Sequence, residues 1–200
     1  MKRRAIAFFL PFAFTSAASA ADVNYPVVET LDAFLDGCGS LENQQMASAS
    51  LIAAGWTPIS RNEETGQLAV FLDFSRKAAE VAESEGADMG EIISFAKTIA
   101  GEEVFMVLDE VKADGKRISG CQLYDFGEDR PIPAEQAGSW LKRAPFEIKE
   151  FPEVRTAEWS PGVLSGHDSF KIFFVPSDSP ARQMFNFYGV ALKADTLGAE

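Results

Sequence analysis

The chain has 200 residues, of which 46% are hydrophobic and 24% are charged. These proportions are ordinary for a folded globular protein, and they exclude a wholly disordered or collagen-like chain. The 30 Asp and Glu residues outnumber the 18 Lys and Arg residues, which gives a net charge of −12. Because an acidic surface repels phosphate backbones and anionic lipid, we expect no nucleic-acid partner.

The first 20 residues have the three-part layout of a secretory signal peptide. A Lys-Arg-Arg start precedes ten largely apolar residues, and small residues lead up to Ala20. The apolar stretch is shorter than the roughly 20 residues that a membrane span needs. We therefore predict an exported protein, periplasmic or secreted, with a signal peptide at 1–20, cleavage near Ala20, one domain at 21–200 and no stable membrane span afterwards. Cleavage would remove three basic residues and no acidic ones, which leaves a net charge of −15.

The two cysteines, Cys38 and Cys121, are predicted to form a disulfide, because an even cysteine count in an exported protein favours one. Cys38 follows Leu31 and Phe34 at the spacing of one apolar helix face. Cys121 alternates with Leu123 in a strand-like run, so both of these side chains are expected to face the core. Since no Cys-x-x-Cys motif is present, the pair indicates a structural staple rather than a redox centre.

Helical patterns dominate the first half of the chain. The predicted helices cover residues 26–36, 41–54 and 67–84. Gly37 and Gly55 are expected to end the first two of them. The segment 68–74 taken alone also fits a strand, and 92–100 fits either a helix or a strand.

Strand patterns dominate the second half of the chain. The predicted strands cover residues 104–108, 117–126, 153–159, 168–175 and 184–194. Asp114-Gly115 is a strong hairpin signal between the first two, and Pro133 begins a predicted helix over 133–143. Helices followed by antiparallel hairpins argue for an α+β fold. We expect a single antiparallel sheet of about five to six strands with helices mainly on one face.

The sequence lacks the patterns of common catalytic and cofactor sites. It contains no P-loop, no Gly-x-Gly-x-x-Gly and no Gly-x-Ser-x-Gly. One histidine and two paired cysteines cannot supply the several ligands of a zinc site. A Ca²⁺ site made of carboxylates alone stays open, although the sequence has no Asp-x-Asp-x-Asp-Gly loop. We expect no metal, and the missing nucleotide motifs imply no cofactor. We expect a non-enzymatic protein. The alternative is a small hydrolase that uses His167 as a general base, with Asp168 or Asp125 to orient it.

Aromatic residues gather on the last two predicted strands. In a strand, Phe173 points to the face opposite Phe170 and Phe174, and the aromatic residues of 184–194 likewise divide between two faces. One face fills the core, so the other needs a cover: the protein's own helices, a partner chain or an apolar ligand. The residues of such a binding site would be Phe173, Phe185, Phe187 and Tyr188. We therefore expect a protein that binds an envelope protein or a small apolar molecule, or that masks another protein as an inhibitor or scaffold.

Overall fold

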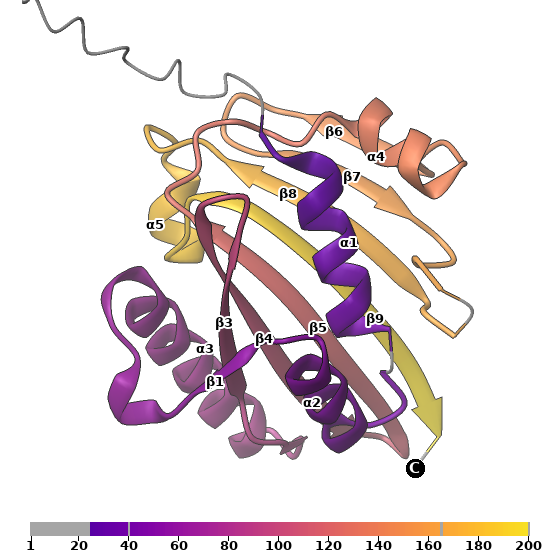
Figure 1. The fold of residues 1–200 in the computed structure, drawn as a ribbon. Helices are drawn as coiled ribbons and strands as arrows, with labels where there is room; N and C mark the ends of the chain where they lie inside the picture. The colour runs from indigo at the N-terminus through magenta and orange to yellow at the C-terminus, as the bar shows by residue number, and fades with distance from the viewer. Residues whose placement is uncertain (1–24, 40, 165, 200) are drawn as a thin grey trace, which may run out of the picture.

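The computed structural model describes residues 25–39, 41–164 and 166–199 (Figure 1). The predicted signal peptide, residues 1–20, lies outside the described residues. The described helices are α1 (Val27–Cys38), α2 (Gln44–Ala53), α3 (Gly66–Ser84), α4 (Ala134–Leu141) and α5 (Ala181–Phe185), and Arg61–Glu63 forms a short 3-10 turn. The first four agree with the predicted helices to within a few residues, and the segment 68–74 is helical. α5 is not among the predicted helices.

The strands join one antiparallel sheet. They are β1 (Thr57–Ile59), β2 (Asp88–Met89), β3 (Ile93–Ile99), β4 (Glu102–Ala113), β5 (Lys116–Phe126), β6 (Glu147–Glu150), β7 (Arg155–Trp159), β8 (Ser169–Val175) and β9 (Gly189–Ala199). Their order is β1-β3-β4-β5-β9-β8-β7-β6, with β2 paired to β4. The α+β class with a single antiparallel sheet is therefore confirmed.

The expected five to six strands are too few, because the sheet has nine in the described residues. β3 is a strand in the segment whose pattern also fitted a helix. β1, β2 and β6 are short, and β6 is exposed along its whole length. Strands of this kind show little apolar alternation, which is the signal that sequence analysis depends on.

The centre of the sheet is built from its three longest strands, β4, β5 and β9. β4 turns into β5 at Asp114 and Gly115, whose φ angles are 54° and 70°. Positive φ at both positions is the geometry that an Asp-Gly hairpin turn favours, so this prediction is confirmed. β5 then pairs along its full length with β9, from Lys116 opposite Ala199 to Phe126 opposite Gly189.

The helices divide between the two faces of the sheet. α1, α2 and α4 pack on what we call the first face, which α1 crosses in Figure 1. α3 and α5 pack with the side chains of the opposite face. Along β4, Met106 and Leu108 belong to the first core and Val107 to the second. The expectation of helices mainly on one face is wrong, because the central strands carry apolar side chains on both faces and each face needs a cover.

α1 continues through Gly37, where the sequence predicts its end. A Cβ at this position would collide with the side chain of Leu51 in α2 and press against the Met106 side chain. The glycine therefore allows α1 to lie close to α2 and to the sheet. The helix ends one residue later, at Cys38.

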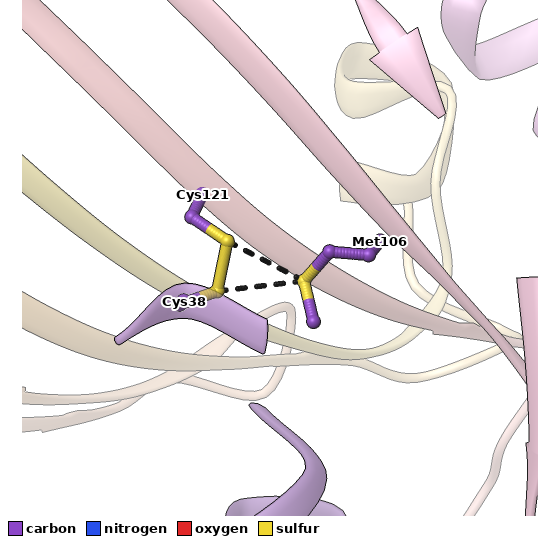
Figure 2. Close-up of a disulfide and its surroundings, with 3 residues drawn as sticks. All are labelled: Cys38, Met106 and Cys121. Atoms are coloured by element: carbon purple, nitrogen blue, oxygen red, sulfur yellow. Dashed lines mark hydrogen bonds between the residues drawn. A yellow bond between two sulfur atoms is a disulfide. The ribbon is translucent and has the colours of Figure 1, made fainter. Parts of the chain in front are cut away.

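A disulfide joins Cys38 at the end of α1 to Cys121 in β5, as predicted (Figure 2). Both cysteines are fully buried in the first core. Met106 Sδ lies 3.5 Å from each of the two cysteine sulfurs. Because neither cysteine keeps a thiol proton, these are packing contacts between sulfur atoms. The bond thus fixes α1 against the centre of the sheet.

The predicted strand 184–194 begins later than expected, at Gly189. Residues up to Phe185 form the last turn of α5, and Asn186 adopts a left-handed conformation after it. Gly189 has φ +121°, and a Cβ there would collide with the backbone oxygen of Asp125. The chain can enter β9 at this point only through a glycine. Phe185 therefore belongs to α5, and Phe187 belongs to the connection between α5 and β9 rather than to a strand.

Candidate ligand-binding groove

The longest helix, α3, covers the second face of the sheet unevenly. In its first half, Leu68 and Leu72 are buried against the sheet. In its second half, Ser75 and Ala79 occupy the positions that follow on the sheet-facing side, and the exposed Ala78 also lines the space. These small side chains cannot fill the space beneath the helix, so a groove remains between α3 and the sheet.

We call this space the α3 groove, and its volume is about 500 Å³. It is lined by Phe71, Phe74, Ser75, Ala78 and Ala79 of α3, by Asp109, Gln122, Tyr124, Phe173, Val175, Ala191 and Lys193 of the strands, and by Met89, Ile92, Phe185 and Phe187. Ligand sites of small molecules have volumes of roughly 300 to 1,000 Å³ and mostly apolar walls with a few polar groups. The α3 groove meets both criteria.

Aromatic rings close the inner end of the groove. The Phe71 ring lies 4.5 Å from that of Tyr124, and Tyr124 lies 5.4 Å from Phe187 in an edge-to-face arrangement. Aromatic pairs at such separations favour one another beyond simple area burial. In contrast, Phe74 and Phe185 are each 42% exposed. These two rings come from α3 and α5 and form the rim of the groove.

The sheet register divides the groove floor into a polar and an apolar level. On the polar level, Gln122 of β5 lies opposite Lys193 of β9. Two residues along the strands, Tyr124 lies opposite Ala191, which in turn lies opposite Phe173 of β8. The floor therefore changes from polar to apolar along the strand direction.

A chain of hydrogen bonds joins the polar groups of the floor. The Tyr124 hydroxyl donates to Gln122 Oε1, and Gln122 Nε2 donates to Asp109 Oδ2 at 2.8 Å. A Cβ on Gly120 would collide with Asp109 Oδ1, so this glycine lets the carboxylate lie against the sheet. Burial raises the pKa of Asp109, while the charge of Lys193 and the Gln122 hydrogen bond oppose that rise. Burial also raises the pKa of Tyr124 well above its ordinary value.

Three of the four predicted binding residues line the α3 groove: Phe173, Phe185 and Phe187. Phe173 points to the face opposite Phe170 and Phe174, as its place in a strand requires. Tyr188 lies elsewhere, in a smaller pocket beside the start of α3. There its hydroxyl accepts a hydrogen bond from Gln67 at 2.7 Å, and its ring lies 4.3 Å beneath the Arg182 guanidinium.

The catalytic candidates His167 and Asp168 lie outside the groove, in the turn between β7 and β8. His167 is 4% exposed, and neither ring nitrogen hydrogen-bonds to a described residue. Burial lowers the pKa of His167. The Cys38 backbone and the negative charges of Asp195 and Asp168 oppose this shift. Neither ring nitrogen of His167 lies in hydrogen-bonding geometry with the Cys38 backbone. The Asp168 carboxylate accepts from the backbone nitrogen of Leu197 at 2.5 Å. The ring of His167 thus has neither an orienting carboxylate nor access to solvent.

Asp125, the other carboxylate considered for His167, belongs to a separate cluster at the opposite end of β9. It accepts a hydrogen bond from the Tyr25 hydroxyl at 3.1 Å. Burial raises the pKa of Asp125 to about 6, and the negative charge of Glu128 adds to the effect. Burial alone would also raise the pKa of Glu128, but hydrogen bonds from Arg130 outweigh it and hold that pKa below its ordinary value.

Within residues 25–39, 41–164 and 166–199, no helix combines the length and apolar character needed to cross a membrane. Among the same residues, no three His, Cys, Asp or Glu side chains gather in a way that could hold a metal ion.

Several groove residues are absent from the sequence-based candidates: Phe71, Asp109, Gln122, Tyr124 and Lys193. One signal for them exists in the sequence. Asp109, Gln122 and Lys193 each interrupt an apolar strand run with a polar side chain. Without the pairing of β5 with β9, nothing in the sequence indicates that these interruptions lie side by side.

No protein-family model, curated protein or solved structure matches this chain. The geometry of the groove is therefore the basis for the functional proposal.

Proposed function

We propose that this protein is an exported binding protein that holds a small apolar molecule in the α3 groove. The observation that carries the proposal is the groove itself: an open space of about 500 Å³ between a helix and a sheet, with aromatic walls. A groove of this size suits a small molecule better than a protein surface, which requires roughly 800 Å² of contact area on each partner.

Two exposed aromatic rings support a binding role. Phe74 and Phe185 each leave more than a third of their surface in water. Both rings lie at the rim of the same groove. An apolar molecule inside the groove would cover part of each ring, and each Å² of apolar surface removed from water contributes roughly 25 cal/mol.

A binding role is favoured over serine-type hydrolysis because Ser75, the serine that lines the groove, has no base beside it among the described residues. The polar side chains of the groove are Ser75, Asp109, Gln122, Tyr124 and Lys193. The Ser75 hydroxyl donates to the backbone oxygen of Phe71 at 3.0 Å, which leaves it without a base to activate it. The one histidine of the chain lies outside the groove.

Export rests on two observations. The first is the signal-peptide layout of residues 1–20. The second is the buried Cys38–Cys121 disulfide, a bond that persists in oxidising compartments such as the periplasm and the extracellular space. We place the binding function in one of these compartments.

The test uses N-phenyl-1-naphthylamine, a neutral apolar dye whose fluorescence rises in apolar surroundings. The blocking variant is Ala78→Trp, which puts a large ring into the groove from α3. The matched control is Glu80→Trp, an exposed position on the same helix that does not line the groove.

We expect the dye to bind the wild-type protein and the Glu80→Trp variant, and to lose binding to Ala78→Trp while the melting temperature stays the same. Absence of dye binding to the wild-type protein would contradict the proposal. Equal binding by the two tryptophan variants would contradict it too, because the dye would then bind elsewhere.

A further inference from the structure

The ammonium group of Lys193 is a feature of the α3 groove for which the described residues supply no hydrogen-bond partner. Lys193 lies on the groove floor in β9 and is partly buried. Its Nζ atom lies 5.6 Å from the ring centre of Tyr124 and 5.4 Å from that of Phe173. It makes no hydrogen bond and no ion pair within 4 Å to any described residue. Burial lowers the pKa of Lys193, since a partly buried ammonium has lost part of its hydration.

The neighbouring acidic group does not complete this site. Asp109 attracts Lys193 through its charge, but no atom pair between them comes within ion-pair distance in the described structure. One oxygen of Asp109 accepts from Gln122, and the other is packed against Gly120. The carboxylate is thus held by the sheet, whereas the Lys193 side chain lines the groove and makes no hydrogen bond to a described residue.

The neighbouring basic group makes the site more positive. Lys171 of β8 lies directly opposite Lys193 in the sheet register. Like charges directly opposite in an antiparallel pair destabilise the sheet. Lys171 is compensated by Glu158, whose Oε1 lies 3.2 Å from its Nζ. Among the described residues, Lys193 has no acidic group within ion-pair distance, and the charge of Asp109 attracts it only from farther away. A bound anion would remove this repulsion.

The charge lies at one end of an apolar groove. The floor changes from the polar level of Gln122 and Lys193 to the apolar level of Tyr124, Ala191 and Phe173 within two residues of strand. A molecule that follows this change in polarity has one anionic end and one hydrocarbon end. A carboxylate is the simplest such head group, because it can accept charge-assisted hydrogen bonds from an ammonium.

We propose that the natural ligand of the α3 groove is a free amphiphilic monocarboxylate, with its carboxylate on Lys193 and its hydrocarbon chain over Tyr124 and Phe173. This inference rests on the proposed binding function and adds the chemical class of the ligand. The ammonium donates its hydrogen bonds to the carboxylate, and the aromatic rings cover the hydrocarbon chain.

The test compares three probes with the same ten-carbon chain: decanoate, decanol and decyltrimethylammonium, each below its micellar concentration. Displacement of N-phenyl-1-naphthylamine reports their affinities. The variants are Lys193→Met, which keeps the apolar stem, and Lys193→Arg, which keeps the charge. The control is Lys171→Met, which removes the neighbouring lysine that already has Glu158 as its partner.

We expect decanoate to bind the wild-type protein at least about tenfold more tightly than decanol, since a hydrogen bond to a charged group contributes that much or more. Lys193→Met should abolish this preference without weakening decanol binding. Lys193→Arg and Lys171→Met should retain it. Thermal melting of each variant shows that it is folded, and if Lys193→Met does not fold, Lys193→Gln replaces it.

Equal affinity for decanoate and decanol in the wild-type protein would overturn the inference while leaving the binding function intact. A preference for decyltrimethylammonium would also overturn it, because Asp109 would then set the charge of the ligand. A decanoate preference that survives in Lys193→Met would show that the head group binds elsewhere. If none of the three probes displaces the dye, the assignment of an amphiphile is wrong. If the dye itself does not bind, the proposed function fails first.

Discussion

The buried carboxylate of Asp125 is expected to make the wild-type protein less stable as the pH rises through the range 4 to 6. Its pKa is about 6 in the folded protein, compared with 3.8 for an ordinary aspartate. Below the lower value both the folded and the unfolded protein hold the proton, so Asp125 does not make the free energy of unfolding depend on pH. Between the two values the unfolded chain releases the proton while the folded protein keeps it, so the free energy of unfolding falls as the pH rises. Above the upper value the folded protein bears the full cost of a buried charge.

The difference of 2.2 between these two pKa values sets the size of the effect. At 1.36 kcal/mol per pKa unit it corresponds to about 3 kcal/mol as an upper figure. Asp125→Asn removes the charge and keeps an oxygen that can accept the hydrogen bond from Tyr25. We therefore expect the free energy of unfolding of this variant to exceed that of the wild-type protein by up to about 3 kcal/mol at pH 7.5, and to equal it near pH 3.5.

The assay is urea unfolding at a series of pH values, followed by circular dichroism. The matched control is Asp129→Asn, which removes a neighbouring but exposed carboxylate and should leave the pH dependence as it is in the wild-type protein. A stability difference between wild type and Asp125→Asn that does not change with pH would refute this reasoning. So would a variant that is less stable than wild type at pH 7.5, since the charge would then be stabilising.

Three further changes test the fold. Replacing Cys38 and Cys121 by alanine removes a covalent link between residues that are 83 apart in the sequence. We expect urea unfolding to show that the free energy of unfolding falls by at most about 4 to 5 kcal/mol. Leu72→Ala creates a cavity under α3 and should cost about 3 kcal/mol in the same assay, whereas a negligible loss would mean that α3 is not packed on the sheet. Because burial lowers the pKa of His167, the unfolded chain binds the proton more readily, so the wild-type protein should lose stability relative to His167→Leu as the pH falls below 6.5. Parallel pH profiles for the two proteins would contradict a buried, neutral imidazole.

Local chemistry made the helices, the hairpin and the disulfide predictable. The spacing of Leu31, Phe34 and Cys38 defines one helix face, and that face is buried in the structure. Asp114-Gly115 specifies its own turn, because both residues accept positive φ. These signals act within a few residues of the chain, where sequence patterns carry most of their information.

The α3 groove was only partly predictable, because long-range pairing assembles it. Phe173 could be placed on one face of a strand by alternation alone. The position of Lys193 beside Gln122 depends on the pairing of β5 with β9, which no local pattern encodes. Phe185 and Phe187 carry a strand-like aromatic pattern, but Ser179 and Pro180 begin a helical turn just before them. Turn chemistry there overrides the aromatic preference for strands.

The measurement that tests the central claim most directly is NMR chemical-shift mapping with N-phenyl-1-naphthylamine on the isotope-labelled protein. We expect the largest shifts at residues on all sides of the α3 groove, namely Phe71, Ala78, Phe173 and Phe187, with little change at Tyr188 in the neighbouring pocket. Shifts concentrated around Tyr188 or along the exposed strand β6, or no shifts at any concentration, would contradict the assignment of the groove as the binding site.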